Sequence, residues 1–187
     1  MSMPTKRFRW FWLLLLTVVI SGCASIFGVH RVPPQIEPVQ PFELDRYLGR
    51  WYEIARLDHR FERNLSQVTA QYNRSEEGIE VINRGYNTQT RQWEKATGKA
   101  RFVDDPNTGH LKVSFFWPIY SGYIVFHNDD YEHVMVTGPS KEYFWLLSRK
   151  PKMPMAAQSR FIAKAKRLGF ATDKLIFVDQ SNQSVAQ

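Results

Sequence analysis

The chain has 187 residues, 43% of them hydrophobic, which is enough for one domain with a sizeable core. The formal net charge is +7, but the basic residues are spread along the chain, so we expect no nucleic-acid partner. One cysteine excludes an intrachain disulfide. The common hydrolase, metalloprotease and phosphate-loop motifs are absent from the sequence, and the five histidines are scattered. We therefore expect no enzyme, no cofactor and no metal site.

The first 22 residues have the pattern of a secretory signal peptide. They contain three basic residues and no acidic one, followed by an apolar run over residues 10–20. As a helix this run would rise only about 16 Å, roughly half the thickness of a bilayer core. Residues 1–22 are therefore predicted to direct export and then to be removed, and not to span the membrane.

Ile20-Ser21-Gly22-Cys23 resembles the lipobox of bacterial lipoproteins. The resemblance implies that Cys23 is acylated and begins the mature chain, and that Ala24 directs the protein to the outer membrane, facing the periplasm. The alternative is an ordinary signal peptide cleaved near an incidental cysteine. Residues 23–41 contain four prolines and are predicted to form a semi-extended tether.

Residues 42–180 are predicted to form one domain, with a tail at 181–187. Alternating apolar residues bounded by turn signals predict eight strands joined by short hairpins, at 49–57, 67–74, 79–87, 92–103, 111–115, 122–127, 133–137 and 143–149. The pattern favours an all-β fold, an eight-stranded antiparallel up-and-down β-barrel. A 3.6-residue period over 154–168 then predicts one C-terminal α-helix packed outside the barrel, and a short strand follows at 175–178.

Five residues are predicted to meet at one end of the barrel. In an up-and-down barrel, alternate turns lie at opposite ends, so the turn holding Asp130 and Tyr131 and the end of the last barrel strand at Arg149 return to the start of the first strand. That strand begins with Gly49-x-Trp51. We expect Arg149 to lie over the indole of Trp51 as a cation–π pair, and the turn carboxylates to hold neighbouring backbone amides.

These residues, followed by one long helix, resemble the conserved motifs of lipocalins. The segment Gly-Arg-Trp-Tyr-Glu-Ile-Ala-Arg at residues 49–56, together with the lipobox, is similar to the bacterial outer-membrane lipoprotein lipocalins. One departure is Asp129, where many lipocalins have Thr. The resemblance implies a calyx that stores or transports fatty acids or lysophospholipids and performs no covalent chemistry.

The predicted inner face of the fourth strand carries only small residues, Ala96, Gly98 and Ala100, which leaves room inside the barrel. The alternative is that small residues are needed where strands bend sharply. The other side chains expected to line the ligand cavity are Glu53, Ala55, Tyr72, Val113, Phe115, Val125, Met135, Tyr143 and Trp145.

The loops of the opposite end are predicted to surround an open mouth. Arg60, Phe61 and Arg63 follow the first strand, and we expect the two arginines to lie near an anionic lipid head group; alternatively they are only solvated. The unusually apolar loop at 116–120 includes Trp117 and Tyr120. It is interpreted as a ligand lid, a membrane-docking tip or a contact in a homodimer.

Two other functions remain open from the sequence. The barrel could be fully packed and serve as a structural periplasmic lipoprotein that binds protein partners through the 116–120 loop. It could also hold haem or another porphyrin, with His127 or His133 as the axial ligand if either points inward.

Overall fold

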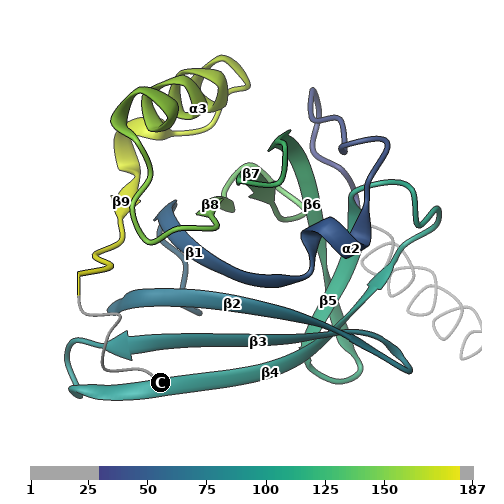
Figure 1. Cartoon of the computed structure of the whole chain (residues 1–187), viewed down its shortest axis with the longest axis horizontal. Coiled ribbons are helices and arrows are strands. Elements are labelled where there is room, and N and C mark those ends of the chain that lie inside the picture. Colours follow the sequence, from purple (N-terminus) through teal and green to yellow (C-terminus); the bar gives the residue numbers. More distant parts are fainter. Residues whose placement is uncertain (1–29, 182–187) are drawn as a thin grey trace, which may run out of the picture.

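The computed structural model describes residues 30–181, which form a closed β-barrel with one long helix outside it (Figure 1). The strands are β1 (Gly49–Arg56), β2 (Leu65–Ser75), β3 (Gly78–Asn87), β4 (Gln92–Phe102), β5 (His110–Phe116), β6 (Ile119–Asp129), β7 (His133–Thr137), β8 (Phe144–Ser148) and β9 (Ile176–Phe177). The helices are α2 (Leu44–Tyr47), α3 (Met155–Arg167) and the 3₁₀ turn η1 (Thr172–Lys174).

Every strand pairs antiparallel with its neighbours, in the order β2-β3-β4-β5-β6-β7-β8-β1-β9, and an additional β1–β2 pairing closes the barrel. β1 makes this closure possible because its first half pairs with β2 and its second half with β8 and β9. The predicted fold, an eight-stranded antiparallel barrel with one C-terminal helix outside, is confirmed.

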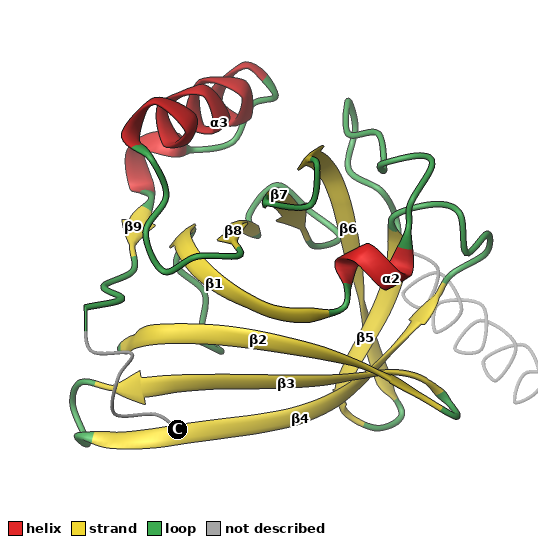
Figure 2. Cartoon of the chain, viewed as in Figure 1, coloured by secondary structure: helices red, strands yellow, loops and turns green. Residues whose placement is uncertain are grey.

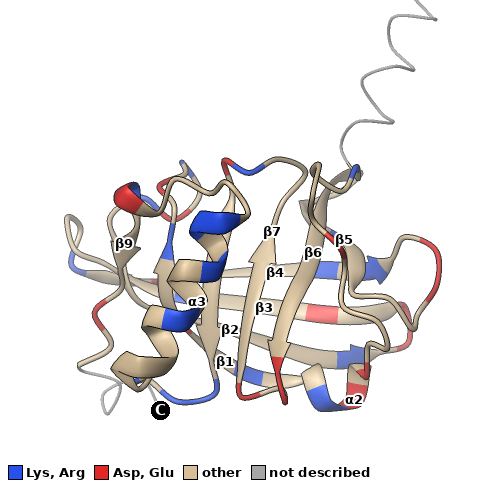
Figure 3. Cartoon of the chain, turned by 90° about the horizontal axis from the view of Figure 1, so that it is seen from above, with Lys and Arg blue, Asp and Glu red and all other residues tan. Residues whose placement is uncertain are grey.

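Apolar side chains form two separate clusters, one inside the barrel and one between the barrel and α3. The inner cluster includes Trp51, Val81, Val134 and Leu147. The outer cluster joins the helix residues Ala157, Phe161 and Ala165 to outward-facing residues of β1, β6, β7 and β8. Figure 2 shows α3 outside the barrel on this side. The opposite face of α3 is basic (Figure 3).

A β-bulge in β1 reverses which side chains point inward. Glu53 lies opposite Leu147, but Ala55 lies opposite Leu146 and Arg56 opposite Trp145, so one extra residue separates Glu53 from Ala55. Ala55 therefore belongs to the outer cluster beneath α3, and Arg56 turns into the barrel. The prediction that Ala55 lines the interior is wrong, because strict alternation does not hold across the bulge.

Met135 also lies outside the barrel. Its neighbours Val134 and Val136 belong to the inner cluster, whereas Met135 pairs with Leu146 and packs in the outer cluster. Because adjacent side chains in a strand point to opposite faces, Met135 contributes to the contact with α3 and not to the predicted cavity.

The described part of the predicted tether packs against the barrel instead of extending away from it. Ile36 is buried in the outer cluster, the amide of Val39 donates to the carbonyl of Val125 at 2.8 Å, and the amide of Gly109 donates to the carbonyl of Val39 at 2.9 Å. At the start of this segment the carbonyl oxygen of His30 lies 2.7 Å from Nε2 of His110. The predicted signal peptide, Cys23 and most of the tail lie outside the described residues.

None of the helices within residues 30–181 has the length and apolar character needed to cross a bilayer.

Candidate ligand site inside the barrel

Trp51 and Arg149 close one end of the barrel. The indole is fully buried and donates from Nε1 to the carbonyl of Tyr47 at 2.8 Å. The Arg149 guanidinium lies 3.8 Å from the centre of the Trp51 ring and donates to the carbonyls of Arg50 at 2.9 Å and Tyr47 at 3.1 Å. Gly49 has a φ of +98°, and a Cβ there would lie 3.3 Å from Nη1 of Arg149. Glycine thus permits both the backbone turn and the approach of the guanidinium.

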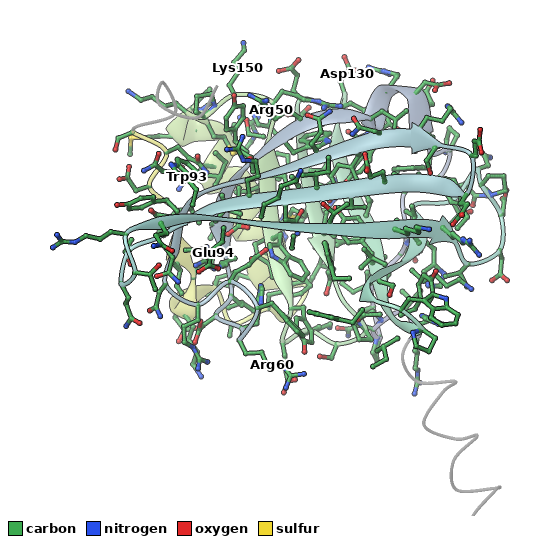
Figure 4. The ribbon with its side chains drawn as sticks, turned by 90° about the horizontal axis from the view of Figure 1, so that it is seen from below. Arg50, Arg60, Trp93, Glu94, Asp130 and Lys150 are labelled. Atoms are coloured by element: carbon green, nitrogen blue, oxygen red, sulfur yellow. The ribbon has the colours of Figure 1, made fainter. Side chains whose placement is uncertain are left out.

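The turn after β6 lies at the same end. Asp130 and Tyr131 both have positive φ, 48° and 59°, and the amide of Tyr131 donates to Oδ1 of Asn128 at 2.6 Å. The Asp130 carboxylate pairs with Arg46. The expectation that the turn carboxylates hold the amides is therefore wrong for Tyr131, since Asn128 provides the acceptor. Figure 4 shows Arg50, Asp130 and Lys150 together at this end and Arg60 at the opposite end.

Three tyrosines form a polar floor above this plug. The hydroxyl of Tyr123 lies 2.5 Å from that of Tyr47 and 2.7 Å from that of Tyr72. Burial raises the pKa of all three hydroxyls, that of Tyr72 to about 12, so they remain neutral at physiological pH. The predicted site residue Tyr72 is thus part of the interior, within a hydrogen-bonded group.

The walls above the floor are apolar and are not completely covered. Val113, Phe115, Tyr123 and Trp145 pack against the inner cluster, yet each remains partly accessible. Ala96 faces the same way on β4 and is exposed near the mouth. Inward-facing side chains of a closed barrel keep accessible surface only where the interior is not filled, so the barrel is open above its floor.

Gly98 is small for a different reason from Ala96. A Cβ on Gly98 would lie 2.6 Å from the carbonyl oxygen of Ser114 and 2.8 Å from the ring of Phe115. The close approach of β5 therefore requires glycine there. This observation favours the alternative interpretation for Gly98, in which strand geometry selects the residue. Ala100 and Val125 are buried in the inner cluster.

A cluster of buried charged groups lies at the mouth. Glu53 is 3% exposed and Arg56 is 2% exposed, and Oε1 of Glu53 lies 2.7 Å from Nη1 of Arg56. The next loop brings in Glu62, whose Oε2 accepts from Nε1 of Trp145 at 3.0 Å and lies 3.0 Å from Nε2 of His59. Arg56 also donates to the carbonyl of Glu62 at 2.8 Å, which holds the β1–β2 loop against the barrel.

The two carboxyl groups have opposite pKa shifts. Burial, together with the nearby Glu62, raises the pKa of Glu53 well above its usual value. Burial alone would also raise the pKa of Glu62, but His59, Trp145 and Arg56 outweigh burial and lower it. Of the two carboxyl groups, Glu62 is therefore the one that ionises more readily, and Glu53 is the one that accepts a proton more readily.

The predicted mouth residues lie on the outer side of this loop. Arg60, Phe61 and Arg63 are all exposed. The guanidinium of Arg60 lies 4.9 Å from the Phe61 ring centre, and that of Arg63 lies 3.4 Å from the carboxylate of Asp58. Tyr143 contacts His59 and Trp145 at the rim. Trp117 is 82% exposed at the β5–β6 turn, and the Tyr120 ring lies 5.6 Å from Nζ of Lys112.

The sequence pattern placed His59 in the loop at the mouth, but it did not predict that Arg56 and Glu62 would point inward beside it. Strict alternation from Trp51 would place Arg56 on the outer face of β1, because the bulge between Glu53 and Ala55 has no marker in the sequence. The histidine and the glutamate lie three residues apart in a loop without periodicity, so neither could be assigned a direction. The one indication in the sequence is indirect: Trp145 and Glu53 need polar partners once they are buried.

His127 and His133 both lie outside the barrel. Each contacts the ring of Phe161 on α3, and Nδ1 of His127 lies 3.0 Å from Nζ of Lys164. Neither is therefore placed as an axial ligand in the interior. In residues 30–181 no three His, Cys, Asp or Glu side chains come together as a metal site.

A closed antiparallel barrel with one plugged end, a partly accessible apolar interior and a single outer helix defines a class of small-ligand-binding calyx proteins. A lipocalin-like domain matches residues 42–180, and the chain belongs to the lipocalin family. Membership in this family makes it a binding protein and not an enzyme.

Several relatives match almost the whole chain. The outer membrane lipoprotein Blc of Vibrio cholerae is 47% identical over 92% of this chain and 99% of its own length. The proteins of the same name from Citrobacter freundii and Escherichia coli K12 are 50% and 47% identical, each over 89% of this chain and 97% of the relative. The protein is accordingly an outer-membrane lipoprotein.

The fold is also similar to that of insecticyanin from the tobacco hornworm, with a TM-score of 0.67. The two chains are 18% identical, and the match covers 81% of this chain and 88% of insecticyanin. At this identity the similarity concerns the fold alone.

Proposed function

We propose that the barrel binds a lipid with a single acyl chain, a fatty acid or a lysophospholipid, and stores or transports it at the outer membrane. The observation that carries the proposal is the partly accessible apolar wall formed by Val113, Phe115 and Trp145 between a neutral tyrosine floor and a charged mouth. A single acyl chain matches this arrangement, because its apolar part occupies the wall region and its head group remains near water.

The charged cluster at the mouth determines where the lipid head group would bind. Arg56 is buried against the Glu53 carboxyl group and the backbone carbonyl of Glu62, whereas Arg60 is exposed on the same loop, with its guanidinium 4.9 Å from the Phe61 ring centre. An anionic carboxylate or phosphate therefore binds more favourably outside the cluster, beside Arg60 and Arg63, than within it. A zwitterionic head group, with one positive and one negative charge, would also bind beside Arg60 and Arg63.

The test is native mass spectrometry of the chain starting at Ala24, purified from a bacterial host, with lipid analysis of its solvent extract. We expect one fatty acid or lysophospholipid per protein molecule. A protein that carries no lipid and also fails to take up a fluorescent fatty acid would contradict the proposal and favour a structural lipoprotein. Visible absorption of the same sample tests for a porphyrin.

The lipid anchor is the second part of the proposal. Acylation of Cys23 would attach the protein to the inner leaflet of the outer membrane. More than one acyl chain is needed, because a single chain gives only marginal membrane binding. Mass spectrometry of the intact protein from membranes, compared with Cys23→Ser, tests this. A wild-type mass without acyl groups, or membrane retention of the variant, would contradict it.

A further inference from the structure

The β5–β6 turn carries a patch of exposed apolar side chains. Phe116, Trp117 and Ile119 are 73%, 82% and 74% exposed, and Pro118 between them is exposed as well. We refer to residues 116–119 as the β5–β6 tip. Contiguous apolar surface of this kind on a soluble barrel marks an interaction site, because exposing it to water is unfavourable.

The β5–β6 tip is at the open end of the barrel. β5 begins at the plugged end and finishes at the tip, and the β1–β2 loop with Phe61 lies at that same end. β9 pairs with Ala55 and Arg56, the open-end residues of β1, so exposed Ile176 and Phe177 lie there too. Among large apolar side chains exposed within residues 30–181, only Met155 lies elsewhere.

The chain between the proposed anchor at Cys23 and the barrel is long enough for this end to reach the bilayer. The described chain begins at His30, which contacts His110 at the first position of β5. The predicted acylation site, Cys23, precedes His30 by seven residues, which span at most about 25 Å when fully extended. β5 itself is about 23 Å long. An anchor at Cys23 would therefore keep the bilayer surface within about one strand length of His110 at the start of β5. This is near enough for the tip, at the other end of β5, to touch the bilayer.

We propose that the β5–β6 tip docks into the lipid surface in which the protein is anchored, with Trp117 at the level of the head groups. Tryptophan favours this interface because its ring is apolar and its N–H is polar. Lys112, whose ammonium lies 5.6 Å from the ring of Tyr120, provides a positive charge behind the tip for anionic head groups. Docking turns the open end of the barrel toward the bilayer.

The exposure of Trp117 distinguishes docking from a lid over the mouth. A lid would bury this ring against inward-facing residues, but 82% of its surface is accessible. Docking rests on the outer-membrane location and on the tip. It does not depend on which lipid occupies the barrel, so the two proposals can fail separately.

The experiment uses the acylated full-length protein in vesicles of phosphatidylethanolamine and phosphatidylglycerol, some prepared with brominated acyl chains that quench nearby tryptophans. Wild type is compared with Trp117→Phe and with the matched control Trp93→Phe. Trp93 contacts Tyr86 and Arg84 on the outer face of β4. We expect brominated lipid to quench wild type and Trp93→Phe similarly, and Trp117→Phe to lose at least two thirds of that quenching.

Equal quenching of all three proteins, or none in wild type, would overturn the proposal. A disulfide cross-link between two Trp117→Cys molecules, found together with no bromine quenching of the wild type, would also overturn it. The tip would then be a contact between two copies of the chain. The thermal midpoint of Trp117→Phe should match wild type and shows that the variant is folded. Lipid bound inside the barrel is measured separately by extraction, and its absence would count against the proposed ligand and not against docking.

Discussion

At the scale of single residues, the mouth of the barrel contains two glutamates whose pKa values are shifted in opposite directions. Glu53 is protonated more readily in the folded protein than in the unfolded chain, because burial and Glu62 raise its pKa. Its contribution to stability is therefore fully present below its unfolded pKa, near 4.5, and decreases as the pH rises toward the folded value. Glu62 has a lowered pKa, so its contribution is lost as the pH falls.

We predict that Glu53→Gln removes the loss of stability that ionisation of Glu53 causes as the pH rises. Glutamine stays neutral, so the free energy of unfolding of the variant relative to wild type should increase as the pH rises from about 5 to 8. Urea unfolding across this range measures the difference. The control is Glu77→Gln: Lys99 lowers the pKa of exposed Glu77 below its usual value, so Glu77 is ionised in both states across this range and the difference between this variant and wild type should not change with pH. A pH-independent difference for Glu53→Gln would refute the assignment.

Arg149→Lys is predicted to weaken the plugged end. Lysine keeps the charge but cannot cover the Trp51 ring and donate to two carbonyls at once. We expect a loss of about 2 kcal/mol in the free energy of unfolding, measured by the urea midpoint. The adjacent exposed residue provides the control, since Lys150→Met should have an effect within about 0.5 kcal/mol. Equal midpoints for Arg149→Lys and wild type would show that the pair contributes little.

At the scale of elements, α3 completes the outer face of the barrel. Its buried residues Ala157, Phe161 and Ala165 cover β1 at the bulge and the neighbouring strands. The bulge places both Ile54 and Ala55 under the helix while Arg56 turns inward. One irregularity in one strand therefore shapes both the helix contact and the mouth.

Phe161→Ala is predicted to destabilise the protein by about 3–5 kcal/mol, because it removes a buried ring and leaves a cavity between α3 and the barrel. Chemical unfolding followed by circular dichroism measures the effect. Met155→Ala is the control on the same helix, since Met155 is exposed and should change stability by less than about 0.5 kcal/mol. Similar losses in the two variants would mean that α3 is not packed as described.

At the scale of the whole molecule, the barrel is closed at one end and accessible at the other. The plug of Trp51 and Arg149 and the tyrosine floor fill the lower part, while Ala96 and Trp145 near the mouth keep accessible surface. A ligand that enters the mouth therefore passes β4 before it meets the floor.

Ala96→Trp should block this path. The indole would occupy the mouth from the inner face of β4, and we expect at least about a tenfold weaker binding of a fluorescent fatty acid, equivalent to 1.4 kcal/mol. Lys95→Trp places the same side chain on the outer face of the same strand and should change binding less than twofold. Fluorescence titration compares the two variants, and equal effects would contradict an interior site.

Much of this architecture could be predicted from the sequence, because it depends on short-range patterns. Alternation and turn residues located all eight barrel strands, and the change of period located α3. Parity along an up-and-down barrel brought Trp51, Arg149 and the Asp130 turn to one end, because alternate hairpins must return there. The lipobox at Cys23 is likewise a local signal, although it lies outside the described residues.

Other features depended on contacts between distant segments. The bulge in β1 is defined by its register against β8, and this register reversed the direction of Ala55 and Arg56. The burial of Glu62 depends on Trp145, which lies 83 residues away, and the packing of Ile36 depends on the outer cluster beneath α3. The sequence by itself determined the elements, the family and the plugged end. Only the tertiary structure decided which charges turn into the mouth, because their burial requires partners that the fold brings together.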